Sequence, residues 1–245
     1  MIWGSASGID VFTSDELKLF NLQILQPRNG YRYSLDPLLL SRFCSTPPQN
    51  GSIIDLGAGC GIISLVMARL NPSASITALE NNPEMTALIR ENIRKNCLER
   101  QIMVQESDLL EYRARFPDSS FDLVVSNPPY RTPQSGKTSP KAGRDSARHE
   151  TTAGLADFLS AAKFLVKPSG RICMIHLPSR LVELTSLATG MKLSTLRLRM
   201  IHNNQESPAT MFMVELAKGR RTQPVVEAPL FVRDMQGNYT DEVWR

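Results

Sequence analysis

From about residue 52 onward the sequence alternates short apolar runs with longer amphipathic stretches, and this alternation constrains the fold more than any other feature. The short runs have the length and composition of strands and lie at residues 52–57, 75–80, 101–108, 121–127 and 170–177. Between them, apolar residues recur at helical spacing over residues 61–70, 83–98, 151–166 and 178–190. Strands that alternate with helices in this way predict a parallel sheet with helices on both faces, and therefore an α/β fold.

The C-terminal part of the chain departs from this alternation. Two strand-like runs, residues 193–202 and 209–217, are joined by a polar turn, which predicts an antiparallel hairpin at the edge of the sheet. Added to the five earlier runs, they predict a mostly parallel, seven-stranded sheet with an antiparallel C-terminal hairpin.

The N-terminal part lacks the alternation as well. Residues 34–44 predict a helix, and residues 11–27 predict an extended or hairpin region. We therefore expect a single domain overall, in which an N-terminal extension over residues 1–50 packs on a core over residues 51–245.

Composition excludes several classes of protein. No apolar run approaches the roughly 20 residues needed to cross a bilayer, and the N-terminus has neither the basic nor the apolar part of a signal peptide. The cysteines are far apart beside apolar neighbours, which is typical of reduced thiols, and they form no metal-ligand spacing with the histidines. We expect a cytoplasmic protein without a metal site or a membrane partner.

The most informative motif is DLGAGCG, at the point where the first core strand ends and a helix begins. Asp55 is followed by Gly57, Gly59 and Gly61. Glycines let the turn take positive φ angles and let a ligand lie against bare backbone. A dinucleotide site requires a further glycine where this chain has Ile62, and an acid before the first glycine suits a cationic amino acid group better than two phosphates. The motif therefore favours a ligand with an amino acid moiety.

Two further acids end the next two predicted strands. Glu80 stands about twenty residues after the glycines, where a carboxylate accepts both hydroxyls of a ribose, and Asn81 follows it. Asp108 ends the third strand, where its carboxylate is able to accept a hydrogen bond from an adenine amino group, with Leu109 against the ring. Because the carboxyl ends of parallel strands share one edge, these residues predict a nucleoside site beside the glycine loop.

The fourth core strand runs directly into Asn127, Pro128, Pro129 and Tyr130. The side-chain carbonyl of Asn127 and the backbone carbonyl of Pro128 are suited to accept the two hydrogens of a planar amino group. Tyr130 offers a face on which a flipped base stacks. A strand cap followed by an extended turn is the structural alternative, and adenine N6, guanine N2 and a glutamine amide all fit as acceptors.

In order and spacing these motifs resemble the class I S-adenosylmethionine-dependent methyltransferases. The resemblance implies a Rossmann-like fold and S-adenosyl-L-methionine as the cofactor. It assigns the methionine part to Asp55 and the three glycines, the ribose to Glu80 and the adenine to Asp108. Asn127 would contact the cofactor as well as act in catalysis, with Pro128 and Tyr130 completing the catalytic motif.

Residues 25–43, the SARHE segment and the C-terminal stretch with PLF and GNYT resemble, more narrowly, the bacterial tRNA-Val (adenine-N6)-methyltransferase family. That resemblance implies methyl transfer to N6 of an adenine beside the anticodon. A glutamine methyltransferase, an rRNA guanine-N2 methyltransferase and a non-catalytic RNA- or cofactor-binding module remain as alternatives.

Tyr31, Ser34 and Asp36 either close over the methionine end of the cofactor or form a turn and a helix cap, with Asp36 capping.

Basic residues are concentrated rather than evenly spread. The net charge of +4 permits an anionic partner without requiring one. One loop carries five of the basic residues, which we expect to contact tRNA phosphates: Arg131, Lys137, Lys141, Arg144 and Arg148. The basic strand at 192–199 is a further candidate for RNA contact.

Overall fold

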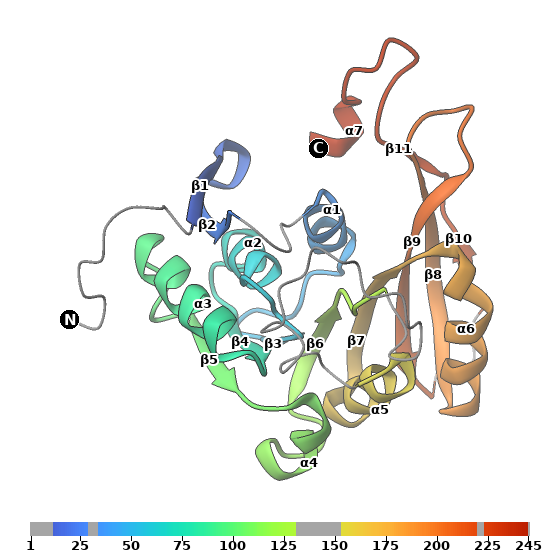
Figure 1. Ribbon diagram of the computed structural model, residues 1–245. Helices are drawn as coiled ribbons and strands as arrows, with labels where there is room; N and C mark the ends of the chain where they lie inside the picture. Colours follow the sequence, from blue (N-terminus) through green and yellow to red (C-terminus); the bar gives the residue numbers. More distant parts are fainter. Residues whose placement is uncertain (1–11, 29–33, 131–152, 220–222, 245) are drawn as a thin grey trace, which may run out of the picture.

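The computed structural model describes residues 12–28, 34–130, 153–219 and 223–244 (Figure 1). Within these residues nine strands form one sheet in the order β10-β8-β9-β7-β6-β3-β4-β5, with β11 also paired to β8. The strands are β3 (Ser52–Leu56), β4 (Ser75–Glu80), β5 (Ile102–Glu106), β6 (Phe121–Ser126), β7 (Val166–His176), β8 (Leu193–His202), β9 (Ala209–Lys218), β10 (Val225–Val226) and β11 (Leu230–Phe231). All neighbours pair in parallel except β9, which runs antiparallel to both β7 and β8.

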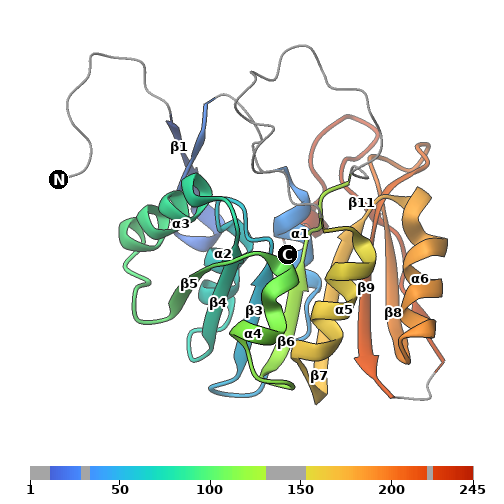
Figure 2. The ribbon, with the colours of Figure 1, turned by 60° about the horizontal axis from the view of Figure 1, so that its bottom comes forward.

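Helices cover both faces of the sheet. Successive strand residues point to opposite faces, so the sheet separates two apolar cores: Ile53 belongs to one and Ile54 to the other. One face is covered by α1 (Asp36–Phe43), α2 (Ile62–Leu70) and α3 (Pro83–Lys95); the other by α4 (Tyr112–Arg115), α5 (Leu155–Leu165) and α6 (Leu181–Gly190), with α4 and α5 in front of the sheet in Figure 2. None of the described helices, including the C-terminal α7 (Asp241–Trp244), is long and apolar enough to cross a membrane.

The predicted α/β fold class is confirmed, and each of the seven predicted strands is present. Several boundaries were wrong by a few residues. Among them, β5 ends at Glu106 rather than 108, β7 begins at Val166 rather than 170, α5 begins at Leu155 rather than 151, and α3 ends at Lys95 rather than 98. The helix stops there because Cys97 takes a left-handed conformation, with φ of 57°. The sheet also extends further than predicted, since β10 and β11 pair with β8, which is therefore not a free edge.

The predicted N-terminal hairpin is formed by β1 (Phe12–Leu17) and β2 (Leu22–Pro27), linked by the short turn η1 (Lys18–Phe20). It attaches to α3 through two asparagines whose side chains imitate a neighbouring strand. Asn92 accepts from the Leu25 amide at 2.7 Å and donates to the Leu25 carbonyl at 2.9 Å, and Asn96 does the same with Gln23 at 2.8 Å in both bonds. Asn92 also donates to the Cys60 carbonyl at 3.0 Å, so the hairpin is tied to the glycine loop as well.

The arginines of the basic strand β8 are neutralised within the protein. Arg197 contacts Glu215 at 2.7 Å and Glu227 at 2.9 Å, and Arg199 pairs with Glu242. The Glu215 residue is only 3 % exposed, and the Arg197 guanidinium also lies over the Phe43 ring at 4.0 Å. Because these charges hold the C-terminal segment and α1 against the sheet, the structure argues against the prediction that this strand contacts RNA.

Candidate active site at the carboxyl edge of the sheet

The predicted site residues share the edge at which the parallel strands end. In the order β6-β3-β4-β5 the chain proceeds outward from β3 through β4 to β5, then returns to place β6 on the other side of β3. Open α/β sheets bind ligands at such a reversal, outside the carboxyl ends of the strands. The glycine loop follows β3, Glu80 ends β4, Asp108 follows β5 and Asn127 follows β6. The structure thus brings together, along one edge, the residues predicted for cofactor and acceptor.

The glycine loop is held in a conformation that needs glycine at three positions. Gly57, Gly59 and Gly61 have φ of 73°, 57° and 84°. A Cβ on Gly61 would lie 3.1 Å from the Ile89 side chain, whereas a Cβ on Gly59 would have no atom within 4 Å. Gly61 therefore permits close packing of α2 on α3, and Gly59 faces open space. The backbone of the loop is therefore open to a ligand at Gly59.

Asp55 is a buried carboxylate, 1 % exposed, and its two oxygens differ in their hydrogen bonding. Its Oδ2 accepts from the Ser64 amide at 3.2 Å and from the Ser64 hydroxyl at 2.8 Å, while Oδ1 is buried and has no hydrogen-bond partner among the described residues. Burial raises the pKa of Asp55 from 3.8 to about 7; the Ser64 hydrogen bonds oppose this rise, and the charge of Glu80 adds to it. A cationic group bound near the loop would favour the ionised form.

Glu80 binds the backbone of two segments. Its Oε2 accepts from the Gly59 amide at 2.8 Å, and its Oε1 accepts from the amides of Asn81 and Asn82 at 3.1 and 2.9 Å. A carboxylate has about four lone-pair sites, so roughly one remains. Accepting two ribose hydroxyls would therefore require release of one of these three amides.

Asp108 and Leu109 are the residues predicted to contact an adenine ring, and both lie at this edge of the sheet. The Asp108 Oδ1 accepts from the Leu110 amide at 2.8 Å and so caps the short turn η2 (Leu109–Glu111). The Leu109 side chain is buried, 5 % exposed, in the core beneath α5. An apolar side chain beside a carboxylate at this edge suits a purine, although the contact itself stays a prediction.

The motif after β6 contacts the first helix. Pro128 is buried, and the Tyr130 hydroxyl lies 2.8 Å from Asn127 Oδ1 and 3.0 Å from Asp36 Oδ2. Asp36 is itself the first residue of α1 and its side chain caps no helix amide, so its interpretation as the helix cap was wrong. The nearby Ser34 hydroxyl accepts from the Asp36 amide at 3.3 Å.

His176 lies beside the predicted site residue Tyr130 and was not itself predicted. It is the last residue of β7, is 1 % exposed, and its ring centroid lies 5.5 Å from that of Tyr130. Its Nδ1 accepts from the Leu177 amide at 2.8 Å. Burial lowers the pKa of His176 to about 4, and the nearby charge of Arg180 (in the short turn η4, Pro178–Arg180) adds to the effect. The imidazole is therefore neutral at pH 7, with its proton on Nε2. In the sequence, its only signal was its position at the end of a buried strand.

The low pKa of His176 predicts a specific loss of stability in acid. Between about pH 6.5 and pH 4 the unfolded chain binds a proton that the folded protein excludes, so the contribution of His176 is present above pH 6.5 and is lost as the pH falls to 4. The full effect is on the order of 3 kcal/mol. His176→Gln should lose less stability than the wild type between pH 7 and pH 4.5 in urea titrations, with His202→Gln as the control. Equal losses in wild type and His176→Gln would contradict the assignment.

The remaining predicted site residues lie outside the described residues. These are Tyr31 and the five basic residues of the loop, Arg131, Lys137, Lys141, Arg144 and Arg148. Their roles stay predictions from the sequence.

Comparisons with known proteins agree with this geometry. The model of the family "Methyltransferase small domain" matches residues 36–176. A Porphyromonas gingivalis protein named tRNA1(Val) (adenine(37)-N6)-methyltransferase is 31% identical over 173 residues, 68% of this chain and 67% of its own. A protein of the same name from Vibrio campbellii is 26% identical over 214 residues, 87% of this chain and 86% of its own.

Solved structures share the fold at lower identity. A predicted O-methyltransferase from Agrobacterium tumefaciens superposes with a TM-score of 0.70 at 23% identity, covering 85% of this chain and 94% of that one. The M. jannaschii tRNA m1G37 methyltransferase superposes with a TM-score of 0.61 at 18% identity, covering 88% and 59%. The predicted Rossmann-like class I methyltransferase fold is thereby confirmed, and the chain belongs to the methyltransferase small domain family.

Proposed function

We propose that this protein transfers a methyl group from S-adenosyl-L-methionine to the exocyclic N6 amine of an adenine in tRNA, beside the anticodon of tRNA-Val. The observation that supports the proposal most strongly is the position of Asn127, Pro128 and Tyr130 directly after β6, next to the glycine loop across the β3–β6 pair. The names of the relatives, which share 26–31% of their residues with this chain over most of its length, supply the nucleotide and the tRNA.

The residues present fit the cofactor. The open space beside Gly59 receives a ligand without displacing side chains, and the unpaired Oδ1 of Asp55 places negative charge beneath the loop, where the amino group of a methionine moiety gains from it. Glu80 would hold the ribose, and Asp108 with Leu109 would hold the adenine. When bound, S-adenosyl-L-methionine supplies an electrophilic methyl group on a sulfonium.

The acceptor residues act on a nucleophile that is weak in isolation, since the N6 lone pair of adenine is delocalised into the ring. The carbonyls of Asn127 and Pro128 accept the amino hydrogens and so localise that lone pair. The methyl group that the bound cofactor supplies would pass from sulfur to N6, and N6 would then release a proton to solvent. Positioning therefore provides most of the catalysis, and no side chain needs to act as a base before the transfer.

The proposed RNA contacts lie beside this site in the chain. The loop after Tyr130 carries Arg131, Lys137, Lys141, Arg144 and Arg148, which we propose contact phosphates, and the N-terminal extension over residues 1–50 would add to that surface. The hydrogen bonds between β2 and α3 support packing of this extension on the domain over residues 51–245. A role in tRNA modification is consistent with a cytoplasmic location, which we propose with it.

The decisive test supplies isotopically labelled S-adenosyl-L-methionine with unmodified tRNA, ribosomal RNA or a protein extract in separate reactions. Each product is digested and its labelled component is identified by mass spectrometry. We expect label in N6-methyladenosine from tRNA. Label in N2-methylguanosine or methylglutamine would retain the cofactor site and overturn the substrate, and cofactor binding without any transfer would favour a binding module.

The two contrasting glycines provide a test of the cofactor site. Gly61→Ala adds a Cβ that crowds Ile89 at a left-handed position, and should destabilise the fold by about 2 kcal/mol. Gly59→Ala meets no crowding and should cost about 1 kcal/mol, but it should weaken S-adenosyl-L-methionine binding about tenfold because its methyl fills the open space beside the loop. Urea denaturation and calorimetric titration measure the two effects. Unchanged affinity in Gly59→Ala would place the cofactor elsewhere.

A further inference from the structure

Two segments far apart in the sequence meet at the hydroxyl of Tyr130. Asp36 comes from α1 and Asn127 from the end of β6, and both place an oxygen within hydrogen-bond distance of that hydroxyl, at 3.0 and 2.8 Å. The three side chains are partly buried, and the ring of Tyr130 packs against the His176 ring, with the ring centroids 5.5 Å apart. Among the described residues, the Asn127 side chain has no other hydrogen-bond partner.

The Tyr130 hydroxyl has one proton, so it is not able to donate to Asp36 and to the Asn127 oxygen at the same time. A phenol carries one hydrogen, and a carboxylate offers only acceptors, so Tyr130 is able to donate either to Asp36 or to the Asn127 oxygen. A hydrogen bond to a carboxylate is the stronger of the two, because the acceptor is charged. With the proton directed to Asp36, two lone pairs would face each other between Tyr130 and Asn127 Oδ1.

Rotation of the Asn127 amide by half a turn removes this conflict. The nitrogen and oxygen of an amide have nearly the same shape, so their assignment follows from the hydrogen-bond network. In the rotated form Asn127 donates Nδ2–H to the phenol oxygen and Tyr130 donates to Asp36, so both of these contacts pair a donor with an acceptor. The Asn127 oxygen is then left without an internal partner and is available to an incoming amino group.

We propose that Asp36 is a positioning residue, which acts through the Tyr130 hydroxyl to orient the Asn127 amide with its oxygen toward the acceptor. This inference rests on the proposed function, since the oxygen that it frees is the one proposed to accept an adenine amino hydrogen. It gives Asp36 a role distinct from contact with the cofactor. It also gives Tyr130 a role beyond offering a face to a base.

Removing the carboxylate and removing the hydroxyl should have different consequences. In Asp36→Ala the hydroxyl of Tyr130 loses its charged acceptor and turns to the Asn127 oxygen, so it blocks that oxygen, and kcat on tRNA should fall about thirtyfold. In Tyr130→Phe nothing blocks the oxygen but nothing orients it, and kcat should fall about fivefold. The double variant should match Tyr130→Phe alone, so the second substitution restores activity to Asp36→Ala.

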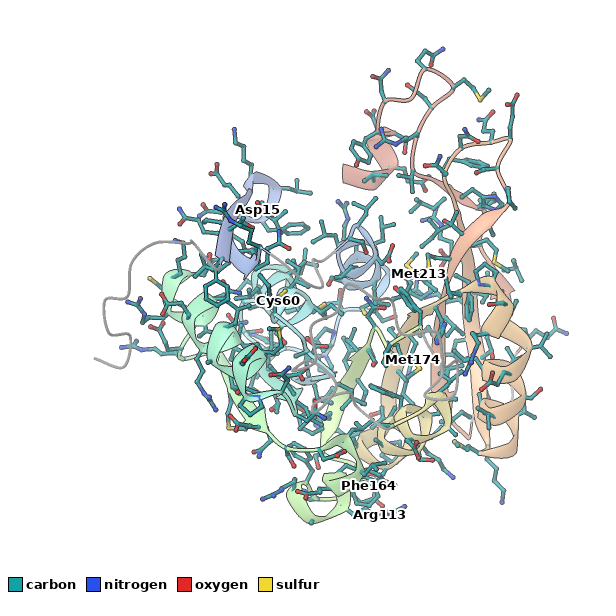
Figure 3. The ribbon with its side chains drawn as sticks, in the orientation of Figure 1. Asp15, Cys60, Arg113, Phe164, Met174 and Met213 are labelled. Atoms are coloured by element: carbon teal, nitrogen blue, oxygen red, sulfur yellow. The ribbon has the colours of Figure 1, made fainter. Side chains whose placement is uncertain are left out.

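We call the chain of hydrogen bonds from Asp36 through Tyr130 to Asn127 the relay. Two control variants distinguish loss of the relay from general damage to the site. Ser41→Ala removes a buried hydrogen bond from the same helix, between the Ser41 hydroxyl and the Pro37 carbonyl at 2.7 Å, and should leave kcat unchanged. Tyr112→Phe removes a tyrosine hydroxyl elsewhere: the Tyr112 ring packs on Phe164, which lies at the end of the molecule opposite Asp15 in Figure 3. Additive losses in the double variant would overturn the relay and would mean that Asp36 only stabilises α1. A weaker cofactor affinity in Asp36→Ala would also overturn it and would mean that Asp36 contacts the cofactor.

A second readout needs no substrate and so distinguishes failure of the relay from failure of the proposed function. The side-chain amide of Asn127 is observed by nitrogen-15 NMR and is assigned from its absence in Asn127→Ala. We expect one of its protons to exchange slowly with solvent in the wild type and at least tenfold faster in both variants. Tyr130→Phe removes the acceptor of Nδ2–H, and in Asp36→Ala the hydroxyl turns to donate to the Asn127 oxygen, so Nδ2–H faces solvent in each case. Unchanged exchange in both variants would overturn the relay even if tRNA is methylated, and faster exchange would support it even if the substrate is another planar amine.

Discussion

Replacing Asn127 with alanine should lower the rate of methyl transfer about a thousandfold while S-adenosyl-L-methionine still binds within a few-fold of the wild-type affinity. The residue directly follows β6, with Pro128 buried behind it, so the backbone should retain its path when the amide is removed. What is lost is a hydrogen-bond acceptor that acts on the nucleophile during the transfer, and such groups affect kcat more than ground-state binding.

Single-turnover rates with prebound cofactor measure this effect directly, and calorimetry measures the affinity. Asn71→Ala is the control: this residue follows α2, and its side chain donates to the Met67 carbonyl at 3.0 Å. A variant at position 127 that kept more than about a tenth of the wild-type rate would mean that the Pro128 carbonyl and base stacking suffice, and the assignment of the amide would then be wrong.

The parts of the site that the sequence predicts are those with local signals. A buried strand that runs into glycines or into an acid marks the carboxyl edge by itself, and strands that alternate with helices must share that edge. Gly59, Glu80, Asp108 and Asn127 were therefore predictable as neighbours, although they come from four different strands. The apolar period of the strands predicted the fold class for the same reason, since each run carries its own pattern.

Other features depend on contacts that no local pattern carries. The bond between Asp36 and Tyr130 spans 94 residues, and His176 is a single histidine whose significance comes from the ring beside it. The strands β10 and β11 have two residues each, too few for a period, and form because β8 offers an unpaired edge. Likewise, the sequence alone does not indicate that Glu215 and Glu227 form ion pairs with Arg197 of β8, because these residues are distant from it in the chain.

Asp55→Asn should make the protein more stable at pH 8 and at the same time weaken its cofactor binding at least tenfold. The pKa of Asp55 is raised by burial from 3.8 to about 7. Between pH 4 and pH 7 the folded protein therefore holds a proton that the unfolded chain has released. The stability that comes from this proton is full below pH 4 and is lost as the pH rises through 7.

The side-chain amide in Asp55→Asn does not ionise, so the stability of this variant lacks the pH dependence that Asp55 causes in the wild type. Ionising the buried carboxylate costs on the order of 4 kcal/mol at pH 8, and an amide avoids that cost. The oxygen of the introduced amide would still accept from Ser64, but its nitrogen would stand where Oδ1 of Asp55 has no partner among the described residues, which costs about 1–3 kcal/mol. A net gain of about 2 kcal/mol at pH 8 should remain, and at pH 4 the amide should give no advantage over the protonated carboxyl.

Urea titrations without cofactor at pH 5 and pH 8 test the stability, and Asp118→Asn provides a control of opposite sign. The Ser119 hydroxyl holds the pKa of the exposed Asp118 below its ordinary value, so loss of that charge should destabilise the protein at pH 8. If Asp55→Asn also destabilises at pH 8, the carboxylate has a partner that offsets its burial.

The affinity measurement decides what the buried charge is for. If the Asp55 carboxylate acts on a cationic amino group, wild-type affinity for S-adenosyl-L-methionine should rise from pH 6 to pH 7.5 as the carboxyl ionises, and the affinity of Asp55→Asn should stay flat. A gain in stability with unchanged affinity would mean that the charge serves only the loop and Ser64. A gain in stability with lost affinity would show that the chain keeps an unfavourable buried charge because the cofactor makes use of it.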